Sequence, residues 1–364
     1  MSEYSLDAFP PSADLETVPV LRALVQAHRQ LAELKGVART IPNEGMLIST
    51  LSLQEAQSSS EIENIITTQD ALYRYQIQPD QSDPVSKEVA HYAEGLNIGF
   101  AAVRNTGLLT LNSILAIQAA LEGNDAGFRK TLGTVLKNEQ TGAVVYEPPS
   151  PLELPRLMST LERFIHDPST LDPLVRMALI HHQFESIHPF YDGSGRTGRI
   201  INILFLVKEG LLDTPILYLS RYISQTKSGY YQALQRVRDE NDWEQWLLYL
   251  LRGVAVTARH TTRLVEDFRV LLQRRKQRIR SEYKFYSQDL INNIFRHPYT
   301  KVAFLEHDLG VSRATASRYL DALSSGGILE KHKLGREDYY INRALVDLLF
   351  ELPSLVDDGL GIRN

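Results

Sequence analysis

The chain contains no cysteine among its 364 residues. This absence excludes a disulfide scaffold, a thiolate nucleophile and any zinc site that uses cysteine ligands. There is also no uninterrupted apolar run of about 18 residues, so the sequence predicts no membrane-spanning helix. The segment from Met1 to Pro11 lacks a basic stretch followed by an apolar run, which argues against a secretory signal peptide. From these absences we expect a cytoplasmic protein.

Neither sign of charge dominates the composition. There are 39 Lys and Arg against 44 Asp and Glu, which gives a net charge of −5. The chain as a whole therefore lacks the strongly basic character that favours nucleic acid or an acidic membrane, although a local patch remains open. Its 43% hydrophobic and 23% charged residues exclude a disordered or fibrous protein. The length allows two or three domains.

Apolar residues recur at helical spacing over most of the chain. The expected helices cover residues 15–34, 46–53, 55–66, 87–104, 111–121, 152–165, 173–187, 197–209, 229–237 and 243–280. Two prolines and several polar residues predict a loop over 73–84. Two β-prone runs around a polar turn predict a hairpin over 134–146. The sequence thus indicates a mainly helical protein with little sheet.

The last part of the chain changes in character. Residues 259–284 are rich in Lys and Arg and predict a basic helix that links two domains. A short amphipathic helix, a turn at Gly310 and a second helix capped by Ser312 then predict a helix-turn-helix. Two strands around a polar turn follow, as in the wing of a winged helix. Because charge between residues 297 and 345 is nearly balanced, the pattern leaves open whether DNA or protein is the partner.

The most informative stretch is the run His188–Arg199, with the sequence HPFYDGSGRTGR. Its closely spaced glycines let backbone N–H groups face one point without obstruction by a Cβ atom. A helix expected to begin near Thr197 directs its free N–H groups to the same point. Arg196 and Arg199 add donors suited to phosphate oxygens. Together these features predict an anion site that suits a polyphosphate.

Two further groups in this run suggest chemistry at the anion site. Asp192 is a hard oxygen ligand, and Mg²⁺ commonly binds one or two carboxylates together with substrate phosphates. His188, with an unperturbed pKa of roughly 6.5, can accept a proton from a hydroxyl group. The stretch from Gly193 to Gly198 also matches G-x-G-x-x-G, but helical spacing before it argues against a dinucleotide fold. No Gly-Lys-Ser/Thr follows, which excludes a P-loop. We interpret His181 and His182 as surface or packing residues.

The run resembles the signature of the Fic family, H-P-F-x-D/E-G-N-G-R-x-x-R, with Ser194 in place of the asparagine. The resemblance extends to the predicted hairpin, which corresponds to the family's target-docking flap, and to residues 218–231, which flank the adenine. It implies a mainly α-helical Fic fold with a small hairpin flap and a C-terminal winged helix-turn-helix domain. The implied regions are an N-terminal helical region carrying an inhibitory helix (1–105), the Fic catalytic core (106–258), a basic linker helix (259–284) and a winged-helix-like domain (285–364).

The activity implied by the resemblance is protein adenylylation. AMP would pass from ATP to a Tyr, Thr or Ser hydroxyl of a target protein, with release of diphosphate. His188 would deprotonate the hydroxyl, Asp192 would hold Mg²⁺ and Arg199 would hold the γ-phosphate. The implied ATP-binding residues are Glu63, His188, Gly193, Ser194, Gly195, Arg196, Thr197, Gly198, Arg199, Gln225 and Tyr230.

A second motif lies far upstream. The segment Ser59–Asn64 resembles the family's inhibitory motif, Ser/Thr-x-x-x-Glu-Gly/Asn. Ser59 and Glu63 are four residues apart and therefore share one face of a helix. A carboxylate delivered to Arg199 would form a charge-assisted pair and occupy the place of the γ-phosphate. The resemblance thus implies self-inhibition.

Two other functions stay open at this point. One is a DNA-binding regulator, reading DNA through residues 285–364, whose Fic domain only senses ATP. The other is a Fic enzyme that removes AMP or transfers another phosphate-bearing group. We further expect a homodimer that modifies itself as well as its target.

Overall fold

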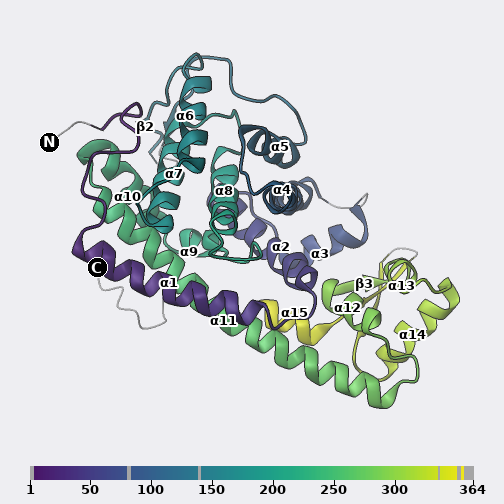
Figure 1. Cartoon of the computed structure of the whole chain (residues 1–364). Coiled ribbons are helices and arrows are strands. Elements are labelled where there is room, and N and C mark those ends of the chain that lie inside the picture. The colour runs from purple at the N-terminus through teal and green to yellow at the C-terminus, as the bar shows by residue number, and fades with distance from the viewer. Residues whose placement is uncertain (1–3, 80–82, 138–140, 335–336, 351–353, 356–364) are drawn as a thin grey trace.

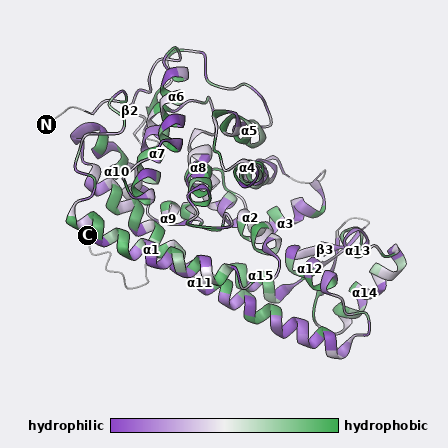
Figure 2. Ribbon diagram, viewed as in Figure 1, coloured by the Kyte–Doolittle hydropathy of each residue, from purple (hydrophilic) through white to green (hydrophobic). Residues whose placement is uncertain are grey.

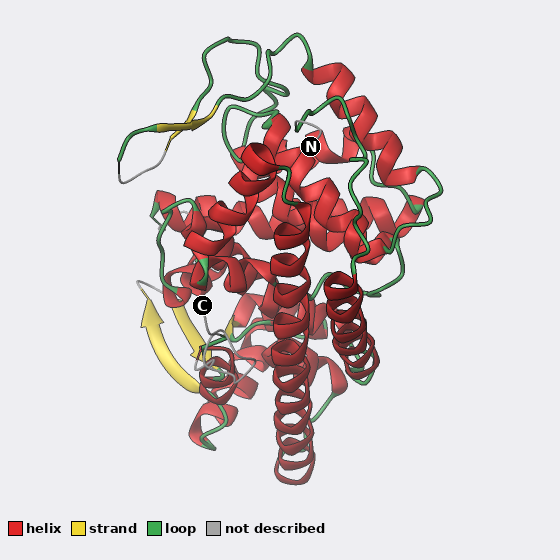
Figure 3. Cartoon of the chain, turned by 90° about the vertical axis from the view of Figure 1, so that its left-hand side faces the viewer, coloured by secondary structure: helices red, strands yellow, loops and turns green. Residues whose placement is uncertain are grey.

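The computed structural model describes residues 4–79, 83–137, 141–334, 337–350 and 354–355. Helices dominate this part of the chain (Figures 1 and 3). The first half comprises α1 (Val18–Ala38), α2 (Glu44–Ile62), α3 (Gln69–Ile77), α4 (Pro84–Thr106), α5 (Leu111–Glu122), β1 (Leu136–Lys137), β2 (Val144–Tyr146) and α6 (Leu154–His166). The central part comprises α7 (Pro173–Ile187), α8 (Ser194–Lys208), α9 (Leu219–Gln225), α10 (Lys227–Glu240) and α11 (Trp243–Glu282). The C-terminal part comprises α12 (Gln288–Arg296), β3 (Tyr299–Lys301), α13 (Val302–Leu309), α14 (Arg313–Ser325), β4 (Glu330–Leu334), β5 (Glu337–Ile341) and α15 (Arg343–Phe350).

Helices α7 and α8 form the centre of the fold. Every residue of α7 from Leu174 to Ile187 is buried, as expected of a helix enclosed on all sides. Helix α8 packs against α7, α4 and α5, and the approach of α4 is close: a Cβ on Gly99 would overlap Leu204 and lie 2.7 Å from Ile117 Cδ1. The run from His188 to Arg199 therefore joins two firmly packed helices.

Helix α11 is the longest element and extends along one side of the molecule (Figure 1). Its first half packs along α1, whereas its second half is largely hydrophilic (Figure 2). Arg274 and Arg280 are exposed there, and Ile279 between them is buried. Residues 259–282 of the predicted basic linker thus belong to this one helix, and the predicted boundary between residues 258 and 259 lies inside it.

The C-terminal part contains the predicted helix-turn-helix and hairpin. The Ser312 side chain caps α14 by accepting a hydrogen bond from the Thr315 N–H, and Gly310 ends α13 in the left-handed conformation. Strands β3, β5 and β4 form an antiparallel sheet in that order. The Phe285 ring stacks on Tyr319 at 4.1 Å between centroids and joins the segment after α11 to α14. A mainly helical fold with small antiparallel strands, as predicted, is confirmed.

Several local predictions were wrong. The two helices expected at 46–53 and 55–66 are the single helix α2, and part of the loop expected at 73–84 belongs to α3. Helix α8 begins three residues earlier than expected, and α9 was not predicted. Residues 138–140, the turn of the predicted hairpin, lie outside the described residues.

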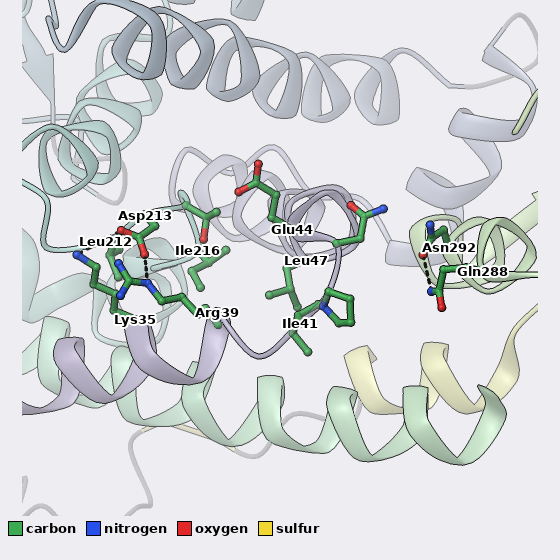
Figure 4. A pocket seen from close by; sticks show the side chains of 14 residues that line it. Lys35, Arg39, Ile41, Glu44, Leu47, Leu212, Asp213, Ile216, Gln288 and Asn292 are labelled. Carbon is green, nitrogen blue, oxygen red and sulfur yellow. Dashed lines mark hydrogen bonds and ion pairs between the residues drawn. The ribbon is translucent and has the colours of Figure 1, made fainter. Parts of the chain in front are cut away.

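A crevice of about 580 Å³ lies where four segments of the chain meet (Figure 4). It is lined by the end of α1, the start of α2, the loop 212–216 and α12. Lys35 and Arg39 both pair with Asp213 there, at 3.2 and 2.5 Å. Within the described residues, no helix has the length and apolar character that a membrane crossing needs.

Candidate active site

His188 is placed by the end of α7. Its N–H donates to Phe184 O at 2.9 Å, and its φ of 45° puts it in the left-handed region at the helix C-terminus. Such an end followed by proline is a common way to stop a helix. The pKa of His188 is lowered to about 4, chiefly by burial; Glu63 opposes this shift, and Arg129 and Arg238 add to it. The imidazole is therefore neutral at physiological pH and can accept a proton.

The loop after His188 prepares the N-terminus of α8. Gly193, with a φ of 76°, is the N-cap residue, and the Thr197 N–H donates to its carbonyl oxygen at 2.8 Å. The Ser194 hydroxyl accepts a hydrogen bond from the Phe190 N–H at 3.1 Å and so closes the loop. The first-turn amides of α8, beginning at Ser194, are left to bind an anion. The serine side chain itself is used within the loop.

Arg199 is buried one turn into α8 and is held by α2. Its Nε donates to Ser59 Oγ at 2.7 Å, and its Nη2 donates to Ser59 O at 2.9 Å. Nη2 also donates to Glu63 Oε1 at 2.6 Å. Burial alone would lower the pKa of Arg199, but the carboxylates of Glu63 and Glu185 outweigh this effect and raise it. Of the three predicted inhibitory residues, Ser59, Glu63 and Asn64, the first two therefore contact the arginine that we expected to hold the γ-phosphate.

The Glu63 carboxylate also lies over the anion cradle. A Cβ on Gly195 would be 2.5 Å from Glu63 Oε1 and 3.0 Å from Arg199 Nη1. The carboxylate oxygen therefore occupies space directly above the first turn of α8. Since carboxylate and phosphate oxygens have the same charge and the same need for donors, Glu63 and a bound phosphate would compete for this position.

Asn64 ends α2 directly after Glu63 by taking up the left-handed conformation. Its φ is 62°, its N–H donates to Glu61 O at 3.0 Å, and the Ile65 N–H donates to Ser60 O at 3.0 Å. These two bonds form the Schellman motif, whose left-handed position favours Gly or Asn. The preference for Gly or Asn at the last position of the predicted inhibitory motif thus follows from the backbone. Only a residue that tolerates the left-handed conformation lets the helix stop after Glu63.

Arg196 is surrounded by three carboxylates. Its Nε lies 3.3 Å from Glu63 Oε2, its Nη1 lies 3.0 Å from Glu88 Oε1, and its Nη2 lies 2.9 Å from Glu122 Oε1. Burial raises the pKa of Glu122, although Arg196 opposes this rise. Glu88 on α4 and Glu122 on α5 were not predicted, because no local pattern connects them to a motif far away in the sequence. Both motif arginines are therefore already paired with carboxylates.

An open cavity of about 530 Å³ borders these groups. Asp192 is exposed at its edge, beside Gly193 and Arg196. Within the described residues, no group of three or more acidic or histidine side chains is placed to hold a metal ion. A single carboxylate next to an anion cradle nevertheless fits Mg²⁺, which takes its other ligands from phosphates and water.

Three family models match successive parts of the chain. They are described as Fic/DOC family N-terminal over residues 21–101, Fic/DOC family over 108–206, and protein adenylyltransferase SoFic-like, C-terminal domain, over 271–345. The second model contains the whole run from His188 to Arg199. The chain belongs to the Fic family.

Curated Fic relatives match over short regions. A probable protein adenylyltransferase of Aquifex aeolicus is 38% identical over 84 residues, which is 23% of this chain and 26% of the relative. The protein adenylyltransferase Fic of Drosophila melanogaster is 33% identical over 105 residues, 28% of this chain and 20% of the relative. The matches thus span about a quarter or less of these relatives.

Solved Fic structures share the fold. A Fic family protein from Desulfovibrio desulfuricans G20 has a TM-score of 0.57 at 19% identity and covers 91% of this chain and 98% of its own. A Fic domain-containing signaling protein from Bacteroides thetaiotaomicron VPI-5482 has a TM-score of 0.56 at 20% identity, covering 66% of this chain and 98% of its own.

The hairpin of this Fic fold is attached close to His188. Strands β1 and β2 pair antiparallel and extend from the helical body (Figure 3). The Arg238 guanidinium lies 3.8 Å from the centroid of the Tyr146 ring. Arg129 Nε donates to His188 O at 2.9 Å, while its Nη2 donates to Pro149 O at 2.5 Å. Val144 and Val145 are exposed, so the hairpin presents apolar side chains at the surface.

Two residues expected at the adenine, Tyr230 and Gln225, make contacts within the fold. The Tyr230 ring is buried among Tyr231, Trp246 and Tyr249, and its hydroxyl lies 3.0 Å from His181 Nε2. Gln225 Oε1 accepts a hydrogen bond from the Leu355 N–H at 2.9 Å. Neither residue lines the cavity beside Gly193. His181 and His182 are fully buried, as packing residues should be.

Proposed function

We propose that the protein is a protein adenylyltransferase, which transfers AMP from ATP to a Tyr, Thr or Ser hydroxyl of a target protein. The observation that carries the proposal is a neutral imidazole, His188, directly before a helix N-terminus that presents amides and two arginines. The names of the curated relatives, protein adenylyltransferases, agree with it.

The proposed reaction is a displacement at the α-phosphorus. The His188 imidazole accepts the proton of the target hydroxyl, and the oxygen forms a bond to the α-phosphorus. The bond from this phosphorus to the oxygen bridging to the β-phosphate breaks, and diphosphate leaves with that electron pair. The amides of α8, Arg196 and Arg199 stabilise the negative charge that develops on phosphate oxygens. Asp192 would hold Mg²⁺, which neutralises phosphate charge when bound. Contacts of Gln225 and Tyr230 with the adenine stay predictions.

We further propose that Glu63 inhibits this reaction. Its carboxylate contacts both Arg199 and Arg196, so an incoming triphosphate meets a negative charge where it needs donors. ATP then binds with its γ-phosphate displaced, or α2 moves and frees the arginines. Either path lowers the fraction of molecules in which the α-phosphorus faces His188.

Radiolabelled ATP tests the proposed reaction. Label in the α-phosphate should appear on protein, and label in the γ-phosphate should not. The His188→Ala variant should lose transfer and keep ATP binding, because the amides of α8 and both arginines remain. Mass spectrometry of the modified protein identifies the group transferred and the acceptor residue. Transfer of γ-label, an added group other than AMP, or substantial activity of His188→Ala would contradict the proposal.

A second candidate function concerns the C-terminal domain. Arg313 and Arg318 are exposed on α14, the position of the recognition helix in a helix-turn-helix. We propose DNA as a partner of this surface. Gel-shift assays on random and genomic DNA, with Arg313→Ala as the comparison, would detect such binding, and absence of any shift at low salt would exclude it. A homodimer and a cytoplasmic location remain predictions.

A further inference from the structure

The helix that carries Ser59 and Glu63 is enclosed along its length by two different parts of the chain. Its C-terminal end contacts the anion site, and Glu55 in its middle accepts a hydrogen bond from the Ser220 backbone N–H of the catalytic core at 3.3 Å. The opposite side of α2 faces the C-terminal domain: the Ser49 hydroxyl donates to Arg296 O at 3.1 Å, and Gln54 Nε2 donates to Leu349 O at 2.5 Å.

Helix α3, on the other side of Glu63 in the chain, is bound by the same domain. The Tyr299 hydroxyl donates to Asp70 Oδ1 at 2.5 Å, and Lys301 Nζ donates to Ile77 O at 2.6 Å. The Tyr73 ring stacks on Tyr299 and on Phe350, with centroids 5.3 and 5.7 Å apart. An apolar cluster joins both helices to the C-terminal domain; its buried members are Leu53, Tyr73, Ile77, Tyr299, Tyr339, Ile341 and Val346.

We infer that the C-terminal domain is a clamp that holds the inhibitory helix in its closed position. This inference rests on the proposed role of Glu63. The two helices bound by the domain flank the segment from Glu63 to Thr68, so they fix both ends of the segment that carries the carboxylate. Gln54 and Glu63 are nine residues apart on α2 and its cap, about 14 Å of rigid helix. A displacement at Gln54 is therefore transmitted to the anion site.

The energetic consequence follows from linkage. The contacts with the C-terminal domain exist while α2 and α3 are in place, and they add to the free energy needed to move Glu63 away from Arg199. Any change that weakens them raises the population of the open state. Helix α14 packs on α13 and β4 and has exposed arginines, so the domain keeps a second face available while it holds α2.

The test uses the full chain with α-labelled ATP and two substitutions in the cluster. Tyr73→Ala removes the stacked ring from α3, and Val346→Ala is a milder change within α15. Val311→Ala is the matched control, because Val311 belongs to the same domain and lies in the turn of the helix-turn-helix. We expect Tyr73→Ala to raise self-modification about fivefold or more, Val346→Ala to raise it less, and Val311→Ala to leave it unchanged. Amide hydrogen exchange at residues 59–63 should rise in the same order.

The same substitutions in a Glu63→Gly background show whether the C-terminal domain acts on transfer through Glu63. If the clamp acts through Glu63, the gains should largely disappear there. Equal gains in both backgrounds, or unchanged transfer and unchanged exchange in folded Tyr73→Ala and Val346→Ala proteins, would overturn the inference. If Glu63→Gly itself transfers no label, the proposed activity fails, and amide exchange at residues 59–63 still decides whether the C-terminal domain holds α2.

Discussion

Replacing Glu63 with glycine removes a carboxylate that contacts both motif arginines. Its oxygens lie 2.6 Å from Arg199 Nη2 and 3.3 Å from Arg196 Nε, and its side chain is 27% exposed. A hydrogen bond to a charged group contributes about 1.5–3 kcal/mol. Since one of the two contacts is long and the site is partly open, we take about 2–3 kcal/mol for the pair. This energy corresponds to roughly a 30- to 150-fold change in the competent population.

We therefore expect Glu63→Gly to raise kcat/KM for ATP in self-modification by about 10- to 100-fold, somewhat below this limit, because the bonds from Arg199 to Ser59 persist. Initial rates with α-labelled ATP over a range of ATP concentrations at fixed Mg²⁺ measure the effect. A change in KM alone would indicate simple competition for the arginines. A change in kcat would indicate that the carboxylate also turns the α-phosphate away from His188.

Two control variants distinguish the effect of removing the Glu63 charge from the effect of loosening the end of α2. Glu61→Gly places the same flexible residue on an exposed position of the same turn, and it should change the rate little. Glu63→Gln keeps the side-chain volume and removes the charge, so its gain should lie between wild type and Glu63→Gly. Equal rates for wild type and Glu63→Gly at saturating ATP and Mg²⁺ would refute the inhibitory role. A gain in Glu61→Gly as large as that in Glu63→Gly would mean that helix loosening, not charge, activates the protein.

Three other changes test the site and its support. Because the pKa of His188 is about 4, the rate of transfer should not depend on the titration of His188 above about pH 5 and should decrease at lower pH. Glu63→Gly removes a carboxylate that raises this pKa, so this variant should shift the acid limb of the pH–rate profile to lower pH. A folded-state pKa below the ordinary 6.5 also means that the stability contributed by His188 is complete above pH 6.5 and is lost as pH falls towards 4, which urea unfolding against pH would measure. Gly99→Ala should destabilise the fold by about 1–3 kcal/mol through overpacking, whereas Gly36→Ala, with no atom within 4 Å, should be neutral or stabilising by thermal unfolding. Asn64→Gly should keep inhibition, and Asn64→Val should raise transfer, since valine disfavours the left-handed cap.

The sequence correctly predicted those elements whose ends are set by neighbouring capping residues and prolines. Helix α7 has the predicted bounds, Pro173 to Ile187, because proline and Asp172 start it and proline follows its end. The cap at Ser312 is likewise where the sequence placed it. The spacing of Ser59 and Glu63 correctly predicted one shared helix face, and both side chains reach Arg199.

What the sequence could not predict depends on tertiary contacts. Helix α3 forms in a segment with a proline on its C-terminal side because Tyr73 and Ile77, four residues apart, are buried against the C-terminal domain. Glu88 and Glu122 reach Arg196 from separate helices, and no sequence motif around either residue indicates a role at the site. The partner of Gln225, Leu355, is 130 residues away. Such pairings arise only when the helices pack.

The unbroken course of α11 from Trp243 to Glu282 constrains how the chain can change by insertion and deletion. A loop between two domains absorbs one added residue with little effect on their orientation. In a continuous α-helix, one added residue advances the remainder by about 1.5 Å and turns it by about 100°. An insertion near Lys276 would therefore rotate β3 and β5 away from α3, although the sequences of the segments before and after the insertion would be unchanged. The spacing between the two parts is thus fixed in angle as well as in length, and variants in this segment should be tolerated as substitutions far better than as changes in length.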